Sequence, residues 1–137
     1  MLTTRDGPVW LVLLAVGLGA AAGGVLRWTI SYCFNRTWDV MPLGTLLCNW
    51  LGACVIGAVT AYLVCHPEVP AWVRLFVVTG LLGGLTTFST FSMENVSLLM
   101  AGAYLRALSH AGLHLAGSLL STGIGFVLVE TFLRSKS

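Results

Sequence analysis

Four long stretches without a charged residue constrain this chain more than any other feature of its sequence. They cover residues 7–26, 40–66, 75–93 and 107–129. An α-helix rises 1.5 Å per residue, so about 20 apolar residues cross the roughly 30 Å of hydrocarbon in a bilayer. Lipid does not tolerate exposed strand edges, and the chain lacks the alternation typical of barrel strands. We therefore predict an all-α integral membrane protein with four transmembrane helices.

The composition agrees with this interpretation. Only 9% of the 137 residues are charged, whereas about a quarter is usual in soluble domains. Tryptophan favours the headgroup layer of a bilayer, and tryptophans lie near the ends of the stretches at positions 10, 28, 38 and 72. We predict one domain over residues 1–137, with membrane spans at residues 8–31, 41–65, 72–99 and 107–132.

The basic residues give the chain almost no preferred orientation. Four spans place both termini on one side of the membrane, and an excess of Lys and Arg normally marks the cytoplasmic side. The side with the termini and the middle loop carries basic residues at positions 5, 74, 134 and 136. The opposite side carries them at positions 27, 36 and 106. This near balance allows copies of the chain to insert in both orientations.

The third stretch has the most unusual sequence. Five hydroxyl side chains crowd into residues 86–92, just after Gly83 and Gly84, and glycine is a poor helix former. One interpretation is a helix that unwinds in the membrane, where freed carbonyls bind cations and half-helix N-termini attract anions. The other is a continuous helix whose hydroxyls bond back to their own turn. The residues alone favour neither interpretation.

Further polar side chains lie at the depth of the membrane. Asn49 is near the middle of the second span, with Thr45 one turn earlier on the same face. The fourth span carries His114, Ser118 and Thr122 at spacings of four residues, which form a line on one helix face. Such a line is typical of a face that contacts water or ions, and hydrogen bonding between helices is the alternative.

Two phenylalanines and two pairs of glycines complete the pattern. Phe88 and Phe91 share a helix face and are interleaved with hydroxyl side chains. Aromatic pairs at this spacing usually pack against each other. The positive edges of the rings can also line a route for a small anion. Glycines lie four residues apart in the first span (19 and 23) and in the third (80 and 84). For the first pair we favour ordinary close packing of membrane helices.

Three motifs resemble the signatures of the Fluc (CrcB) family of fluoride channels, and they occur in the right order. They read Gly23-Gly24-Val-Leu-Arg27-Trp, Gly44-Thr45-Leu-Leu-Cys-Asn49 and Gly80-Leu-Leu-Gly-Gly-Leu-Thr-Thr-Phe-Ser-Thr-Phe-Ser-Met-Glu94. The resemblance extends over nearly the whole chain. It implies a third helix that is broken in mid-membrane and an antiparallel, dual-topology homodimer. It also implies passive export of F⁻ through two pores across the cell (inner) membrane, which confers fluoride resistance.

The resemblance also implies roles for individual residues. The fluoride pathway would be lined by Phe88, Phe91 and Asn49, with a polar track from Thr45, Ser118 and Thr122 and with His114 beside it. Gly83 and Thr86 would provide backbone carbonyls to a structural Na⁺ on the dimer axis. Arg27 matches the basic residue after the first helix, and Glu94 matches the acid that ends the phenylalanine motif.

Two other functions fit four short apolar helices. A proton-coupled small multidrug exporter needs a carboxylate embedded in the membrane, whereas Glu94 and Glu130 only border the charge-free stretches. A scaffold subunit without transport activity would explain the glycines but not the polar residues at membrane depth. The few ionisable residues provide neither a catalytic dyad nor a metal-binding set, and the cysteines show no metal-binding spacing, so we do not expect an enzyme. No basic cluster indicates a nucleic-acid partner.

Overall fold

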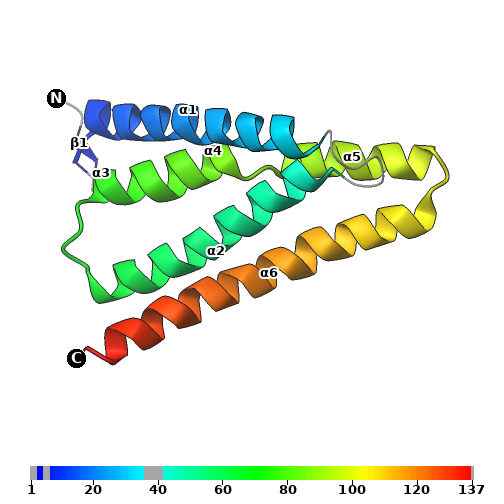
Figure 1. The fold of residues 1–137 in the computed structure, drawn as a ribbon. Coiled ribbons are helices and arrows are strands. Elements are labelled where there is room, and N and C mark those ends of the chain that lie inside the picture. Colours follow the sequence, from blue (N-terminus) through cyan, green and yellow to red (C-terminus); the bar gives the residue numbers. More distant parts are fainter. Residues whose placement is uncertain (1–2, 5–6, 36–41, 137) are drawn as a thin grey trace.

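The computed structural model describes residues 3–4, 7–35 and 42–136, which form four helical rods after a short N-terminal strand pair (Figure 1). Strands β1 (Thr3–Thr4) and β2 (Gly7–Pro8) pair antiparallel. The first two rods are α1 (Val9–Phe34) and α2 (Leu43–Cys65). The third consists of α3 (Ala71–Arg74), η1 (Leu75–Leu82), α4 (Gly83–Leu85) and α5 (Phe88–Met100), and the fourth is α6 (Tyr104–Arg134).

All four rods are long and apolar enough to cross a membrane, which confirms the predicted all-helical, multi-pass architecture. The first three rods each begin directly after a proline, at Pro8, Pro42 and Pro70. Proline has a fixed φ and no N–H, so it suits the position where a helix starts. Met41, the first residue of the predicted second span, and two of the basic residues considered above, Arg5 and Arg36, lie outside the described residues.

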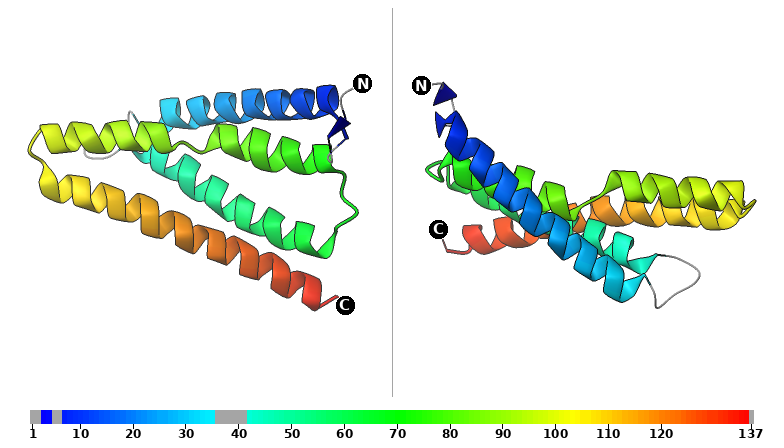
Figure 2. Two further views of the ribbon diagram at one scale, coloured as in Figure 1. Left: turned by 180° about the vertical axis from the view of Figure 1, so that it is seen from behind. Right: turned by 90° about the horizontal axis from the view of Figure 1, so that it is seen from above.

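The rods lie side by side, and α1 begins at the end of the molecule where α6 finishes (Figure 1). Helix α1 runs along the η1–α4 part of the third rod, and α6 runs along α2. Helix α5 and the first part of α6 project together beyond α2 (Figure 2). This arrangement places the junction between α4 and α5 opposite the middle of the bundle, where α2 and α6 also pass.

The predicted packing role of the glycines in the first span is confirmed. A side chain at Gly19 would place its Cβ 2.5 Å from the carbonyl oxygen of Phe76 and 2.9 Å from the Cα of Gly80. A side chain at Gly84 would lie 2.6 Å from the carbonyl of Ala20. The two glycine pairs therefore face each other and let α1 contact the third rod through its backbone. Such close contact replaces the hydrophobic driving force that helices lack in lipid.

The turn between α5 and α6 is short because Gly102 adopts a φ of +70°. Its N–H donates to the carbonyl of Leu99, and the N–H of Ala103 donates to the carbonyl of Leu98. These two bonds form a Schellman motif, which satisfies the last carbonyls of α5. The motif reverses the chain within three residues and holds α5 antiparallel to α6.

Alanine substitutions at Gly17 and Gly19 should have opposite effects on stability. Gly17 is exposed, and a Cβ added there would meet no other atom within 4 Å, so Gly17→Ala should leave stability unchanged or raise it by up to about 1 kcal/mol. Gly19→Ala meets backbone atoms and should destabilise by about 1–3 kcal/mol. Unfolding of the purified variants in mixed detergent measures both, and a Gly19→Ala as stable as Gly17→Ala would contradict the glycine contact.

Candidate functional site

The helical path of the third rod is interrupted at two threonines. Helix α4 ends at Leu85, and α5 begins at Phe88. Between them the backbone is extended, with φ, ψ of −81°, 152° at Thr86 and −149°, 113° at Thr87. Threonine is β-branched and loses side-chain freedom in a helix, so two adjacent threonines after Gly83 and Gly84 favour such a conformation.

Side chains satisfy the backbone groups that this interruption exposes. The N–H of Thr87 donates to Asn49 Oδ1 at 2.8 Å, and Asn49 Nδ2 donates to the carbonyl of Thr87 at 3.2 Å. Thr87 Oγ1 accepts from the N–H of Thr90 at 3.2 Å and so caps the start of α5. Thr86 Oγ1 bonds back to the carbonyl of Leu82 at 2.8 Å. Back-bonding of a hydroxyl therefore occurs at Thr86, as the continuous-helix interpretation expected, but beside an interruption, and the capping role of Thr87 was not predicted.

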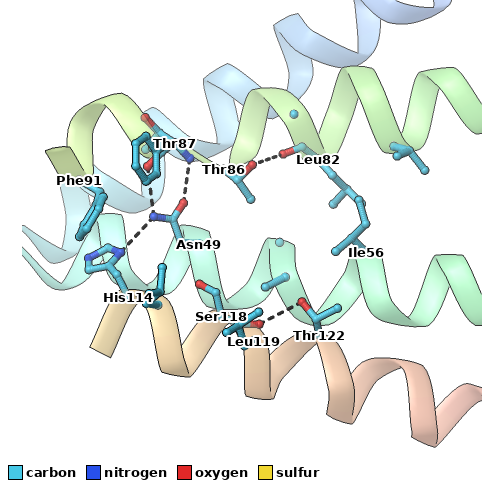
Figure 3. Close-up of a pocket in the computed structure, with 16 residues that line it drawn as sticks. Asn49, Ile56, Leu82, Thr86, Thr87, Phe91, His114, Ser118, Leu119 and Thr122 are labelled. Atoms are coloured by element: carbon cyan, nitrogen blue, oxygen red, sulfur yellow. Dashed lines mark hydrogen bonds between the residues drawn. The ribbon is translucent and has the colours of Figure 1, made fainter. Parts of the chain in front are cut away.

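A pocket of about 420 Å³ lies beside the interruption, between the third rod, α2 and α6 (Figure 3). It brings together eight of the residues singled out in the sequence. These are Asn49, Gly83, Thr86, Phe88, Phe91, His114, Ser118 and Thr122. The rest of its lining is mainly apolar, including Ile56, Leu82 and Leu119. A few hydrogen-bonding groups in an otherwise apolar cavity are typical of a small-ligand site.

One end of the pocket combines the Asn49 amide with aromatic rings. Asn49 Nδ2 lies 3.1 Å from His114 Nδ1. The ring of Phe91 lies 4.8 Å from the His114 ring and 5.4 Å from the Phe88 ring, measured between centroids. Phe88 is 73% exposed, so this ring forms an uncovered part of the rim. Ring edges and an amide are weak partners for an anion.

The polar line of α6 faces the same pocket. The side chains of His114, Ser118 and Thr122 all contribute to its wall, and the Ser118 hydroxyl points into the cavity (Figure 3). Thr122 Oγ1 donates to the carbonyl of Ser118 at 3.0 Å, within its own helix. Asn49 on the opposite wall belongs to α2, so two helices provide donors to one space.

Three of the predicted site residues lie outside the pocket lining. Thr45 is fully buried, and its Oγ1 donates to Glu94 Oε1 at 2.6 Å. The sequence places Glu94 at the border of the third stretch, but its side chain is only 14% exposed and lies inside the third candidate span, Ala71–Met100. Arg27 lies within α1 and not after it as predicted, because α1 continues to Phe34, and it donates from Nε to the carbonyl of Gly84 at 3.0 Å. These three residues position the third rod rather than line the cavity.

Sequence reasoning missed His110, and the expectation that the ionisable residues provide no metal-binding set is wrong, because Glu94, His110 and His114 offer ligand atoms within 4.8 Å of one another. The ring of His110 is fully buried on α6, one turn before His114, and the two ring centroids are 4.5 Å apart. His110 Nε2 lies 3.3 Å from Glu94 Oε2 on α5, and its ring stacks on Phe91 with centroids 5.4 Å apart. The signal was present in the sequence, because two histidines four residues apart share a helix face.

The carbonyls of Gly83 and Thr86 are suited to binding a cation. In a continuous α-helix they would accept from the N–H groups of Thr87 and Thr90. Those N–H groups donate instead to the side chains of Asn49 and Thr87. Both carbonyls are thus released from their helical partners, and hard cations such as Na⁺ prefer oxygen ligands of this kind.

Comparison with known proteins finds a family and relatives that match most of this chain. Residues 14–126 match the family described as "CrcB-like protein, Camphor Resistance (CrcB)". A protein from Bordetella bronchiseptica named "Fluoride-specific ion channel FluC" is 50% identical over 125 residues, which cover 90% of this chain and 95% of that protein. A protein of the same name from Thiobacillus denitrificans is 54% identical over 113 residues, 82% of this chain and 91% of that protein.

The capping role of Thr87 can be tested against Thr60, an exposed threonine on α2. Thr87→Val removes the acceptor for the N–H of Thr90, and loss of such a cap typically costs about 0.5–2 kcal/mol. Thr60 Oγ1 bonds only to the carbonyl of Ile56 in its own turn, so Thr60→Val should change stability by less than about 0.5 kcal/mol. Detergent unfolding curves compare the two, and equal stability of both variants would exclude the cap.

Proposed function

The chain belongs to the CrcB family, and from that premise we propose that it is a fluoride-specific ion channel, which passes F⁻ across a membrane without catalysis. The observation that carries the proposal is the match to channels of that name over 90% of this chain and 95% of the relative. The four membrane-spanning rods give the chain the architecture that such a function needs. We place the channel in the cell (inner) membrane, where it exports fluoride and confers resistance.

The pocket provides the chemistry that fluoride conduction requires. F⁻ holds its water strongly, so a pathway must replace that shell with other donors and still release the ion. Asn49, Ser118 and the edges of the phenylalanine rings offer such partners along one cavity. Both Asn49 N–H groups already have partners, Thr87 and His114, so an ion at Asn49 exchanges with one of them. Exchange of this kind keeps the binding weak.

The start of α5 adds a favourable potential. This helix has 13 residues and begins at Phe88, which lines the pocket. The N-terminus of a helix carries a partial positive charge and attracts anions. We propose that the interruption at Thr86 and Thr87 breaks the third span at mid-membrane depth and thereby points this helix end at the ion pathway.

We further propose that two copies assemble as an antiparallel homodimer with two pores. The near balance of basic residues on the two sides of the chain supports insertion in both orientations. The exposed ring of Phe88 supports a second copy that completes the wall of the pathway. On the dimer axis, the released carbonyls of Gly83 and Thr86 would hold a structural Na⁺, which would raise the local potential for an anion.

The proton-coupled exporter is less well supported than the channel. Because Glu94 lies inside the third candidate span, the absence of an embedded acid no longer argues against an exporter. That carboxylate is, however, bonded to Thr45 and paired with His110, and it does not line the pocket. The comparisons favour the channel over both the exporter and a scaffold subunit.

Liposomes loaded with potassium fluoride test the proposed function. Addition of a potassium ionophore should release fluoride rapidly from liposomes that contain the purified protein, as measured with a fluoride electrode. Chloride-loaded liposomes should retain their anion. Ser118→Ala should slow the efflux about tenfold or more, because a hydrogen bond to a charged group is worth about 1.5–3 kcal/mol.

The matched control is Ser97→Ala on α5, since the exposed Ser97 hydroxyl bonds back to the carbonyl of Met93 outside the pocket. This variant should conduct like the unmodified protein. Fluoride efflux that is absent with the ionophore, or equal for chloride, would contradict the channel. Equal efflux from the Ser118 and Ser97 variants would remove Ser118 from the pathway.

Two exposed cysteines test the dual orientation. Cys33 lies near the end of α1 and Cys65 ends α2, so they belong to opposite ends of the bundle. In vesicles of cells that produce the Cys65→Ser variant, a membrane-impermeant maleimide should label about half of the Cys33 population from outside. The Cys33→Ser variant should show the same fraction at Cys65. Labelling of one cysteine fully and of the other not at all would establish a single orientation.

A further inference from the structure

We propose that Glu94, His110 and His114 form a binding site for a divalent transition-metal ion such as Zn²⁺, and that the bound ion inhibits conduction through the neighbouring pocket. The three residues each offer one ligand atom, and these atoms all lie within 4.8 Å of one another. The site is distinct from the carbonyls of Gly83 and Thr86, because its donors are side chains from α5 and α6.

The two helices present these ligands in a favourable arrangement. His110 and His114 are four residues apart on α6, so both rings face the same way, a spacing that other helices use to hold Zn²⁺. Glu94 approaches from α5, with its Oε2 3.3 Å from His110 Nε2. Two imidazoles and one carboxylate are a donor set that suits zinc and related ions.

The polar atoms of this cluster are buried, and apart from the 3.3 Å approach of Glu94 Oε2 to His110 Nε2 several of them make no hydrogen bond. His110 is fully buried and His114 is 5% exposed. Within residues 3–4, 7–35 and 42–136, no hydrogen bond reaches Glu94 Oε2, either nitrogen of His110 or Nε2 of His114. A buried polar atom without a partner costs about 1–3 kcal/mol. A metal ion would satisfy several of these atoms at once.

A second layer of contacts already orients the ligands. Thr45 donates to Glu94 Oε1, which fixes the carboxylate and leaves Oε2 directed at His110. Such outer contacts commonly tune metal affinity. A tetrahedral ion with bonds of about 2.0–2.2 Å holds its ligand atoms roughly 3.3–3.6 Å apart. The ligand atoms of the cluster lie within 4.8 Å of one another, so a small rotation of the side chains brings them to the distances that an ion requires.

The tautomer of His114 links the metal to the pocket. Asn49 Oδ1 accepts from the N–H of Thr87, so Asn49 Nδ2 is the donor to His114 Nδ1 and the ring proton lies on Nε2. An ion bound through Nδ1 displaces the Asn49 amide. An ion bound through Nε2 moves the ring proton to Nδ1, where it faces the protons of that amide. Either mode breaks the contact between Asn49 and His114 at the wall of the pocket.

Zinc binding can be measured independently of transport. The background protein carries Cys33→Ser and Cys65→Ser, because exposed thiols also bind zinc. Calorimetric titration of this metal-free protein in detergent with zinc chloride should show one ion per chain. His110→Gln should weaken the affinity at least about tenfold. His66→Gln, a histidine at the end of α2 outside the cluster, should bind zinc like the background protein.

Two results would overturn the site. One is the absence of zinc binding by the background protein, in which case the cluster is an ion pair between Glu94 and His110. The other is equal affinity of the background protein and His110→Gln. If that variant does not fold, Glu94→Gln replaces it, and the visible absorption of bound Co²⁺ reports whether nitrogen ligands surround the ion.

The inhibitory effect rests on the proposed channel function and is measured as fluoride efflux from liposomes. Zinc should slow the efflux of the background protein at least about tenfold when it saturates the site, and a chelator should restore it. The same zinc concentration should slow His110→Gln less, relative to that variant's own zinc-free rate. Zinc that binds without slowing efflux overturns the inhibition. Absence of efflux before zinc is added contradicts the channel instead, and the calorimetry still decides the metal site.

Discussion

The paired hydrogen bonds between Asn49 and the backbone of Thr87 are the interaction on which the site depends. Inside a bilayer an interrupted helix exposes N–H and C=O groups that water does not reach, and each unsatisfied group costs several kcal/mol. One amide satisfies both groups of Thr87, as acceptor for its N–H and as donor to its carbonyl. These two hydrogen bonds hold α2 against the residues that precede α5. The positions of Phe88 and Phe91 relative to the pocket then follow from the direction of α5.

Close contacts at glycines make that hydrogen bonding possible. Gly52 lies one turn after Asn49 on α2, and a side chain there would collide with the methyl group of Thr86. Between α2 and α6, Gly117 leaves room for the indole of Trp50, whose Nε1 donates to the carbonyl of Leu113 at 3.0 Å. Small residues thus bring three rods near enough for short polar side chains to meet. In lipid, this proximity and the bonds it permits are the main source of specificity.

The sequence predicted what depends on periodicity and composition. Long apolar stretches indicated four spans, and the spacing of His114, Ser118 and Thr122 predicted a shared face that the pocket wall does contain. Thr45 and Asn49 lie one turn apart, and both were predicted to line the ion pathway. The sequence did not predict that the Thr45 hydroxyl donates to the Glu94 carboxylate. That contact depends on how α2 is rotated against α5, which no local pattern encodes. The π-helical stretch Leu75–Leu82 also had no recognisable signal.

The ring of Phe91 separates two kinds of polar chemistry. On one side it lines the pocket, where neutral donors offer an anion weak partners. On the other it stacks on His110, behind which lies the only acidic side chain of the third candidate span in the part of the chain that the structure describes, Glu94. A carboxylate facing the pocket would repel F⁻, since two like charges at close range in a medium of low dielectric cost several kcal/mol. Bonded to Thr45 and held beside His110, the negative charge instead lies behind an aromatic wall. His114 is the one residue that belongs to both the cluster and the cavity lining, so it is the contact through which a rearrangement of the cluster reaches the pocket.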